Sequence, residues 1–262
     1  MKFIRKIHVL INNFGFYPVK FFQALRGLPV YFKNLIKFGE QHRRMISELK
    51  IRNYMPYPAD RYDRSGIIES HYFYQDLFIA RKILNANPVK HVDIGSRIDG
   101  FVAIVAAFRK IEVIDIRPLI VNDPNIVFIR QDITDDSFDL RNYCDSVSCL
   151  HTLEHFGLGR YGDSPDPRGH IKGLERIFNI LNTNGKLYLS VPIGLARIEF
   201  DAHRVFSIEY LLGLFEDMFK IDSFSFIDDN DLLHEDTELT AEAVKNNFGC
   251  DYGCGIFELT KL

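Results

Sequence analysis

The sequence predicts an α/β protein: a mostly parallel, doubly wound sheet that carries a helical, basic amino-terminal extension. Three observations lead to this prediction. Between residues 70 and 262, short apolar runs alternate with amphipathic stretches, as strands alternate with crossover helices. One apolar run ends in a tight turn marked by Gly95. Residues 1–52 differ in charge and aromatic content from the rest of the chain.

Charge is divided unevenly along the chain. Residues 1–52 hold 11 Lys/Arg and 2 Asp/Glu, whereas the remaining residues hold 21 and 33. A basic, Phe-rich extension favours contact with something anionic, such as a membrane surface. A solvated basic face, or a helix packed on the main domain, explains the pattern too, and the imperfect periodicity of Pro29–Leu49 favours packing. The acidic remainder gives no reason to expect nucleic acid.

The stretch Tyr54–Gly66 has the composition of a linker, because prolines and glycine interrupt its polar residues. We therefore expect an extension and linker over residues 1–66 and an α/β domain over residues 67–262. Cysteine is scarce, and neither a cleavable leader nor an apolar run of ~20 residues is present. These features predict a cytoplasmic protein that residues 1–52 could hold peripherally at a membrane.

The individual elements follow from local periodicity. A helix from a Ser70 cap to about Asn85 is expected to bury a stripe formed by Phe73, Leu77, Ala80 and Leu84. Strands are expected at Val89–Ile94, Ile111–Ile116, Ile126–Ile129, Asp145–Leu150, Lys186–Val191, Phe219–Ile227 and Gly255–Leu259. Further helices are expected over Phe101–Phe108, from about Ile171 to Leu181, and after a cap at Ser207. The Gly- and Pro-rich residues 157–169 form a loop long enough to be functional.

Ligands of such sheets bind at the carboxyl ends of the strands, and polar residues gather there in this sequence. Asp115 follows Asp93 by 22 positions, close to the ~20 expected of a carboxylate that accepts ribose hydroxyls. Asp132 follows the third expected strand and suits an exocyclic amine such as that of adenine. Gly95 allows the backbone to approach a ligand closely. The ordered set predicts a nucleotide-type site.

Taken together, these pieces resemble the class I S-adenosylmethionine-dependent methyltransferases. The matching stretches are Val92–Gly95, Val113–Asp115, Gln131–Thr134, Asp145–Ser148, Leu153–His155 and Leu181–Pro192. More narrowly, Cys149–Gly169, His170–Glu175 and Arg197–Phe206 resemble the domain of unknown function 268 family. The resemblance covers about residues 70–260 and implies a Rossmann-like, seven-stranded sheet with a late antiparallel strand. It also implies that S-adenosyl-L-methionine is the cofactor, held by Asp93, Gly95, Arg97, Gly100, Asp115, Ile116, Gln131, Asp132 and Ile133.

The glycine motif of the superfamily is altered here. Its second and third glycine positions hold Arg97 and Asp99, and Gly100 comes one place late. The side chain of Arg97 could fill part of the cofactor pocket, point away from it, or pair with the carboxylate of the cofactor.

Methyl transfer to a hydroxyl needs a group that removes its proton, and histidine suits that role near neutral pH. His151 follows the fourth expected strand and is the first candidate, before His203 and His155; Glu154 lies beside them. His151 and His155 could also seat a metal with Asp163 or His170, but no further ligand has a fixed spacing, so we expect no metal.

The sequence therefore predicts an S-adenosylmethionine-dependent methyltransferase that acts on a small-molecule or glycan-type acceptor. The alternative is a catalytically inactive binding or scaffold protein with the same fold, held at a membrane through residues 1–52.

Overall fold

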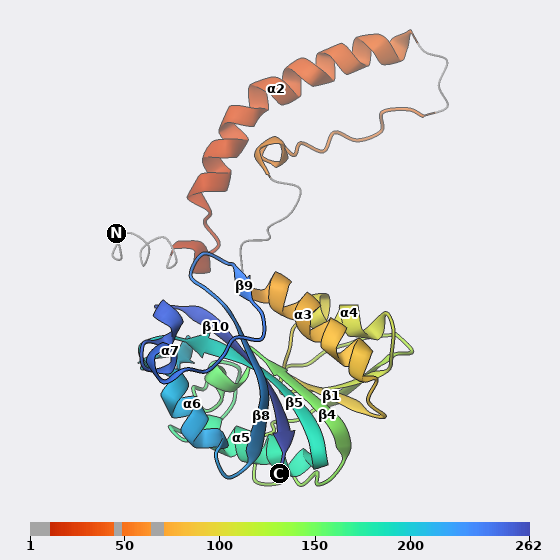
Figure 1. The fold of residues 1–262 in the computed structure, drawn as a ribbon. Coiled ribbons are helices and arrows are strands. Elements are labelled where there is room, and N and C mark those ends of the chain that lie inside the picture. Colours follow the sequence, from red (N-terminus) through yellow and green to blue (C-terminus); the bar gives the residue numbers. More distant parts are fainter. Residues whose placement is uncertain (1–10, 45–48, 64–70) are drawn as a thin grey trace. The chain divides into compact units, whose positions relative to one another are not determined.

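The computed structural model describes residues 11–44, 49–63 and 71–262 (Figure 1). The chain divides into two compact units, Met1–Ile67 and Ile68–Leu262. The expected helix cap at Ser70 and the end of the expected linker at Gly66 lie outside the described residues.

The first unit contains the long helix α2 (Pro18–Arg43) and a short 3₁₀ turn at Asp60–Tyr62. Pro18 is tolerated in the first turn, where its missing N–H would have no partner inside the helix. The interior Pro29 removes a hydrogen bond, and α2 curves along its length (Figure 1). The helix thus begins earlier and ends sooner than the expected Pro29–Leu49. None of the described helices is both long and apolar enough to cross a bilayer.

The second unit is built on a sheet that, within the described residues, has eight strands in the order β3-β2-β1-β4-β5-β10-β8-β9. The strands are β1 (His91–Ile94), β2 (Ile111–Asp115), β3 (Ile126–Arg130), β4 (Cys144–Leu150), β5 (Leu181–Ile193), β8 (Phe219–Ile227), β9 (Leu233–His234) and β10 (Gly253–Lys261). The first five are parallel to one another, and β10 is antiparallel to both β5 and β8. All seven expected strands are present, β9 adds a two-residue edge, and the predicted fold class is confirmed.

Helices cover both faces of the sheet (Figure 1). One face carries α3 (His71–Ala86) and α4 (Ala103–Ala106), and the other carries α5 (Gly169–Ile180), α6 (Ile208–Phe215) and α7 (Ala241–Lys245). As expected, Ser207 caps α6: its hydroxyl accepts a hydrogen bond from the Tyr210 backbone N–H at 3.3 Å. A separate hairpin of β6 (Arg197–Glu199) and β7 (His203–Val205) lies beside β5.

The stripe predicted for α3 was right only in its middle, where Ala80 is buried and Leu77 is partly buried. Phe73 is 42% exposed and Leu84 is 52% exposed, whereas the buried residues are Gln75, Asp76, Phe78, Ile79, Ala80 and Ile83. Apolar residues occur on both sides of this helix, so their spacing alone does not decide which side packs. Which side of α3 packs on the sheet also depends on Gln75 and Asp76, whose burial is made possible by hydrogen bonds.

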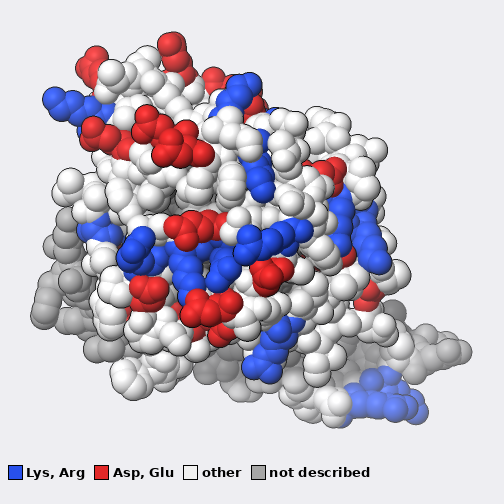
Figure 2. All heavy atoms as spheres, turned by 90° about the horizontal axis from the view of Figure 1, so that it is seen from below, with Lys and Arg blue, Asp and Glu red and all other residues white. Residues whose placement is uncertain are grey.

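Charges on the described surface are mixed in sign. Figure 2 shows basic and acidic side chains interleaved on the face seen from below. Near the start of β5, for example, Lys186 Nζ lies 2.8 Å from Asp222 Oδ2 and 3.7 Å from Glu258 Oε1. Such an exposed network adds little stability per pair.

Candidate active site

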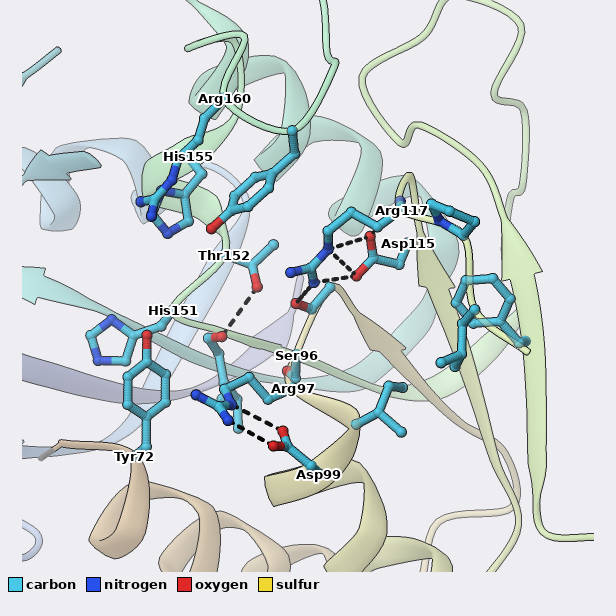
Figure 3. Close-up of a pocket in the computed structure, with 17 residues that line it drawn as sticks. Tyr72, Ser96, Arg97, Asp99, Asp115, Arg117, His151, Thr152, His155 and Arg160 are labelled. Carbon is cyan, nitrogen blue, oxygen red and sulfur yellow. Dashed lines mark hydrogen bonds and ion pairs between the residues drawn. The ribbon is translucent and has the colours of Figure 1, made fainter. Parts of the chain in front are cut away.

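A cleft of about 550 Å³ opens at the carboxyl ends of β1, β2 and β4 (Figure 3). This volume lies within the roughly 300–1,000 Å³ that is typical of small-molecule sites. A smaller hollow of about 50 Å³, lined also by residues that follow β3, adjoins it. The residues that line both spaces are Gly95, Asp115, Arg117, Thr152, His155 and Tyr161. The two spaces are therefore adjacent and share one wall.

The turn after β1 is held by Asp93, which is fully buried. Its carboxylate accepts hydrogen bonds from the Ser96 N–H at 2.9 Å, the Ser96 hydroxyl at 2.7 Å and the Ser148 hydroxyl at 2.5 Å. Burial raises the pKa of Asp93 to about 6, although these hydrogen bonds counteract the rise. Asp93 does not line the cleft, so its part in a cofactor site is to fix the turn.

Gly95 lies in the left-handed region, with φ of +70°, and lines both spaces. A Cβ there would come within 2.5 Å of the Thr152 methyl carbon. Only glycine therefore fits between the turn and the end of β4.

Gly100 and Arg97 mark the altered glycine motif. Gly100 lies outside the cleft lining, and a Cβ there would come within 2.7 Å of Asp76 Oδ2. Arg97 donates to Asp99 through two hydrogen bonds of 3.0 and 2.7 Å, and both side chains are more than half exposed. Both residues line the cleft, and Figure 3 shows the guanidinium turned towards Asp99, so Arg97 neither fills the site nor leaves it.

The residue that reaches into the site is Arg117. Its guanidinium donates to both carboxylate oxygens of Asp115 and to the Gly95 carbonyl at 3.2 Å, as Figure 3 shows. It also lies 4.9 Å from the centre of the Tyr161 ring. Because Arg117 lines both spaces, its side chain stands between them. The carboxylate predicted to accept ribose hydroxyls is thus engaged by the chain's own cation.

The small hollow collects the remaining predicted cofactor residues. Ile116, Gln131, Asp132 and Ile133 all line it. Asp132 Oδ1 accepts from the Thr134 N–H at 2.8 Å and from its hydroxyl at 2.7 Å. Within the described residues the other carboxylate oxygen of Asp132 has no hydrogen bond, so it can accept from a donor in the hollow.

His151 lies at the end of β4 and combines three unusual features. Its backbone is left-handed, with φ of +48°, which costs a non-glycine residue roughly 1–3 kcal/mol. Its Nδ1 lies 2.9 Å from Oε1 of the buried Glu154. Among the described residues, neither His151 Nε2 nor Glu154 Oε2 has a hydrogen-bond partner. Burial lowers the pKa of His151, but Cys254 and Glu154 more than offset it and hold the pKa well above its ordinary value.

Three further side chains surround His151. The His71 ring stacks on it at 5.5 Å between centres, and the Tyr72 ring lies 5.0 Å away. Burial, together with the neighbouring His151, lowers the pKa of His71 to about 4. Within the described residues, one donor atom each of His71, His151 and Cys254 fall within 4.8 Å of one another. The sequence analysis did not bring these three together.

His155 lines the cleft, but His203 does not. His155 Nδ1 donates to the Ala202 carbonyl at 2.7 Å, and burial lowers the pKa of this histidine. His203 lies behind it, 6.5 Å between ring centres, with Nε2 3.6 Å from Glu199 Oε2. The alternative metal set is not assembled, because Asp163 accepts from the backbone of Gly157 and Gly159, and His170 bonds the Tyr210 hydroxyl.

The long loop over residues 157–169 forms one wall of the cleft and is held from below by Arg204. This side chain is 3% exposed. Its guanidinium donates to the carbonyls of Glu154 at 3.2 Å and Phe156 at 2.6 Å, and it also reaches those of Asp166 and Pro167. The loop carries Arg160 and Tyr161 into the lining. Arg117 stands two residues after Asp115 at the end of β2, so the strand-end pattern could have indicated it. The contacts of Tyr161 and Arg204 are made across loops and could not be read from that pattern.

The sheet order, the late antiparallel strand and a cleft at the strand ends define the class I methyltransferase fold. The sequence model of the family described as "Caenorhabditis protein of unknown function, DUF268" matches residues 102–249, more than half of the chain. The chain belongs to this family. No curated protein sequence matches it.

Solved structures are similar to this chain at low sequence identity. The [4+2]-cyclase SpnF has a TM-score of 0.50 and 13% identity, over 82% of this chain and 85% of that chain. The N-methyltransferase NodS from Bradyrhizobium japonicum WM9, in complex with S-adenosyl-L-homocysteine, has a TM-score of 0.49 and 14% identity, over 80% and 93%. The 1,6-didemethyltoxoflavin-N1-methyltransferase of Burkholderia thailandensis has a TM-score of 0.48 and 15% identity, over 71% and 78%.

Proposed function

We propose that the chain is an S-adenosylmethionine-dependent methyltransferase that acts on a hydroxyl of a small-molecule or glycan-type acceptor. The observation that carries the proposal is the His151–Glu154 pair at the end of β4: His151 lines the cleft, and its buried Nε2 has no oxygen or nitrogen partner among the described residues, with Cys254 the polar side chain beside it. Leaving a buried polar atom unpaired costs roughly 1–3 kcal/mol. A chain that keeps this cost at a strained residue in a cleft has a use for that atom.

The residues present fit the cofactor once Arg117 turns aside. Asp115 would hold the ribose, and Gln131, Asp132 and Ile133 would surround the adenine in the small hollow. Gly95 lets the backbone come close to the rest of the molecule. S-adenosylmethionine supplies an electrophilic methyl group when it is bound.

His151 would remove the proton of the acceptor hydroxyl through Nε2, while Glu154 fixes the ring and stabilises the imidazolium that forms. Because its pKa is raised, His151 is a strong base, but it can accept the acceptor's proton only while its ring is neutral. Activity should therefore rise with pH through that pKa.

The mouth of the cleft suits a polar acceptor. Arg97 and Arg160 line it, as do the aromatic rings of Tyr72 and Tyr161. Guanidinium groups bind carboxylates and hydroxyls in fixed geometry. This lining supports a small acidic or glycan-type acceptor over an apolar one.

Calorimetry with S-adenosylhomocysteine tests the proposal directly, and a panel of hydroxylated acceptors assayed for release of this product tests turnover. Binding in the micromolar range with release that requires an acceptor is expected. Absence of binding at millimolar ligand would sink the proposal.

One observation favours the inactive alternative, a binding or scaffold protein with the same fold. Asp115 is already paired with Arg117, so cofactor binding must break a bidentate ion pair. If Arg117→Gln binds S-adenosylhomocysteine no better than the wild type and neither binds at millimolar ligand, the inactive alternative stands.

A further inference from the structure

The helix α2 carries an apolar stripe that the rest of its own unit leaves exposed. At 100° per residue, five large apolar side chains fall within an arc of about 100°. They are Phe21, Phe22, Leu25, Phe32 and Ile36, each between 48% and 65% exposed. The sequence analysis missed this stripe because it began the helix at Pro29, which removed three of the five residues.

The opposite side of α2 is covered within the same unit. The chain around Pro58 crosses the helix at Gly27, where a Cβ would come within 1.9 Å of the Pro58 carbonyl oxygen. At 100° per residue, Gly27 faces almost directly away from the middle of the stripe. The stretch that could have covered the apolar side chains therefore packs elsewhere.

Basic residues border the stripe. Arg26, Lys33 and Lys37 follow one edge of it along the helix, and Glu40 is the acidic residue of the described segment 11–44. Phe and Leu on one side with Arg and Lys beside them is the pattern of a helix that lies in a membrane interface. Lys and Arg near an anionic lipid surface add attraction of about 1 kcal/mol each.

A second copy of the helix fits this face less well. Phe21, Leu25, Leu28, Phe32 and Leu35 have the alternating spacing of a coiled-coil seam. However, the flanking positions that carry charges in a coiled coil are Phe22, Ala24, Pro29, Tyr31 and Ile36. The apolar surface is thus wider than a two-helix seam, and Pro29 bends the helix within it.

We propose that α2 docks the protein on an anionic lipid surface, with the Phe21–Ile36 stripe in the interface and the bordering basic residues against the headgroups. Docking through a single amphipathic helix is peripheral, and salt should weaken its electrostatic part. The proposal is independent of the reaction in the cleft.

Vesicle flotation of the full chain tests it with a matched pair of variants. Phe32 and Phe38 are 55% and 56% exposed on the same helix, but Phe38 lies away from the stripe. Phe32→Glu should lower the partition coefficient on phosphatidylcholine–phosphatidylserine vesicles at least about tenfold, and Phe38→Glu should leave it within about threefold. Lys33→Glu with Lys37→Glu should weaken binding to these vesicles but not to pure phosphatidylcholine.

Each other outcome would overturn the proposal. Wild-type chain that stays in the soluble fraction with anionic vesicles excludes lipid as the occupant. Equal losses for Phe32→Glu and Phe38→Glu, with circular dichroism unchanged, remove the stripe from the contact. A concentration-dependent dimer that Phe32→Glu dissolves, without flotation, assigns the face to a second copy.

Discussion

The two halves of the cleft satisfy their polar groups in opposite ways. In the carboxylate half, Asp93, Asp115 and Asp132 each accept hydrogen bonds from the chain itself. In the histidine half, the buried His151 and Glu154 each keep one polar atom without a partner among the described residues. In the first half the chain itself supplies hydrogen-bond donors to all three carboxylates, whereas in the second half its described part leaves two buried polar atoms without a partner. The difference teaches that the ends of β1, β2 and β3 fix the shape of the cleft, whereas the end of β4 carries the group proposed to react.

Substitution of His151 should have the largest effect, because it removes the unpartnered atom. Asn tolerates the left-handed backbone, so His151→Asn should fold normally and lose about 10²- to 10⁴-fold in turnover. S-adenosylhomocysteine affinity, measured by calorimetry, should change less than threefold. His203→Asn, outside the cleft lining, is the control and should keep most activity. Equal losses in turnover and affinity would move His151 out of the base role.

Asp115 and Arg117 should have opposite effects on the carboxylate half. Asp115→Ala removes the ribose acceptor and should weaken S-adenosylhomocysteine binding by roughly tenfold or more. Arg117→Gln removes the internal competitor and should strengthen binding by a few fold to tenfold. Titration calorimetry on both variants checks the pair. Weaker binding after Arg117→Gln would show that the arginine contacts the cofactor instead of competing with it.

Glu154→Gln should shift the pH dependence of turnover rather than abolish it. The carboxylate helps to hold the pKa of His151 above its ordinary value, so its removal lowers that pKa. The rising limb of kcat against pH should therefore move to lower pH. A limb that stays in place, measured across pH 5 to 9, would separate Glu154 from the base.

The smallest effect is expected at His91, which lies outside the cleft lining, and concerns the free energy of unfolding. Burial lowers the pKa of His91 to about 3, so this histidine stays neutral in the fold and protonates first in the unfolded chain. Its contribution to stability is present above pH 6.5 and is lost as pH falls, at up to about 1.4 kcal/mol per pH unit. The free energy of unfolding, measured by denaturation at pH 7 and pH 5, should fall by about 2 kcal/mol less in His91→Gln than in the wild type.

Asp93→Asn provides the contrast. The pKa of Asp93 is raised to about 6, so the folded protein gains stability relative to the unfolded chain as pH falls from 6 towards 3.8. Asp93→Asn removes that gain and should make the acid loss steeper, opposite in sign to His91→Gln. Equal slopes for both variants and the wild type would contradict the assignment.

Much of the fold could be predicted because strands and crossover helices depend on local apolar runs. The strand at Phe219–Ile227 was predicted at its observed bounds, and the cap at Ser207 was found. The buried face of α3 was not predicted, because it includes Gln75. This polar side chain is accepted in the core since the Ser190 hydroxyl, 115 positions away, donates a hydrogen bond to it. Local spacing carries no information about such a partner.

The site divides along the same line. Gly95, Asp115 and Asp132 could be placed at the cleft because each lies at the carboxyl end of a strand or within two residues of it. Of the three roles left open for Arg97, the structure shows none directly, because Asp99 holds its guanidinium; the side chain that stands in the site is Arg117 instead. Which carboxylate Arg97 and Arg117 each pair with depends on the geometry of the turns after β1 and β2, and the glycine motif alone does not encode that geometry.

The position of β10 has a consequence for synthesis of the protein. The last strand in sequence is not at an edge but between β5 and β8. Until it has been made, the nascent chain holds β5 with an open edge and β8 without a neighbour on that side. Such edges are prone to pair with other chains. A stop codon shortly before Gly253 would therefore remove an interior strand, and we expect the truncated product to aggregate rather than persist as a smaller enzyme.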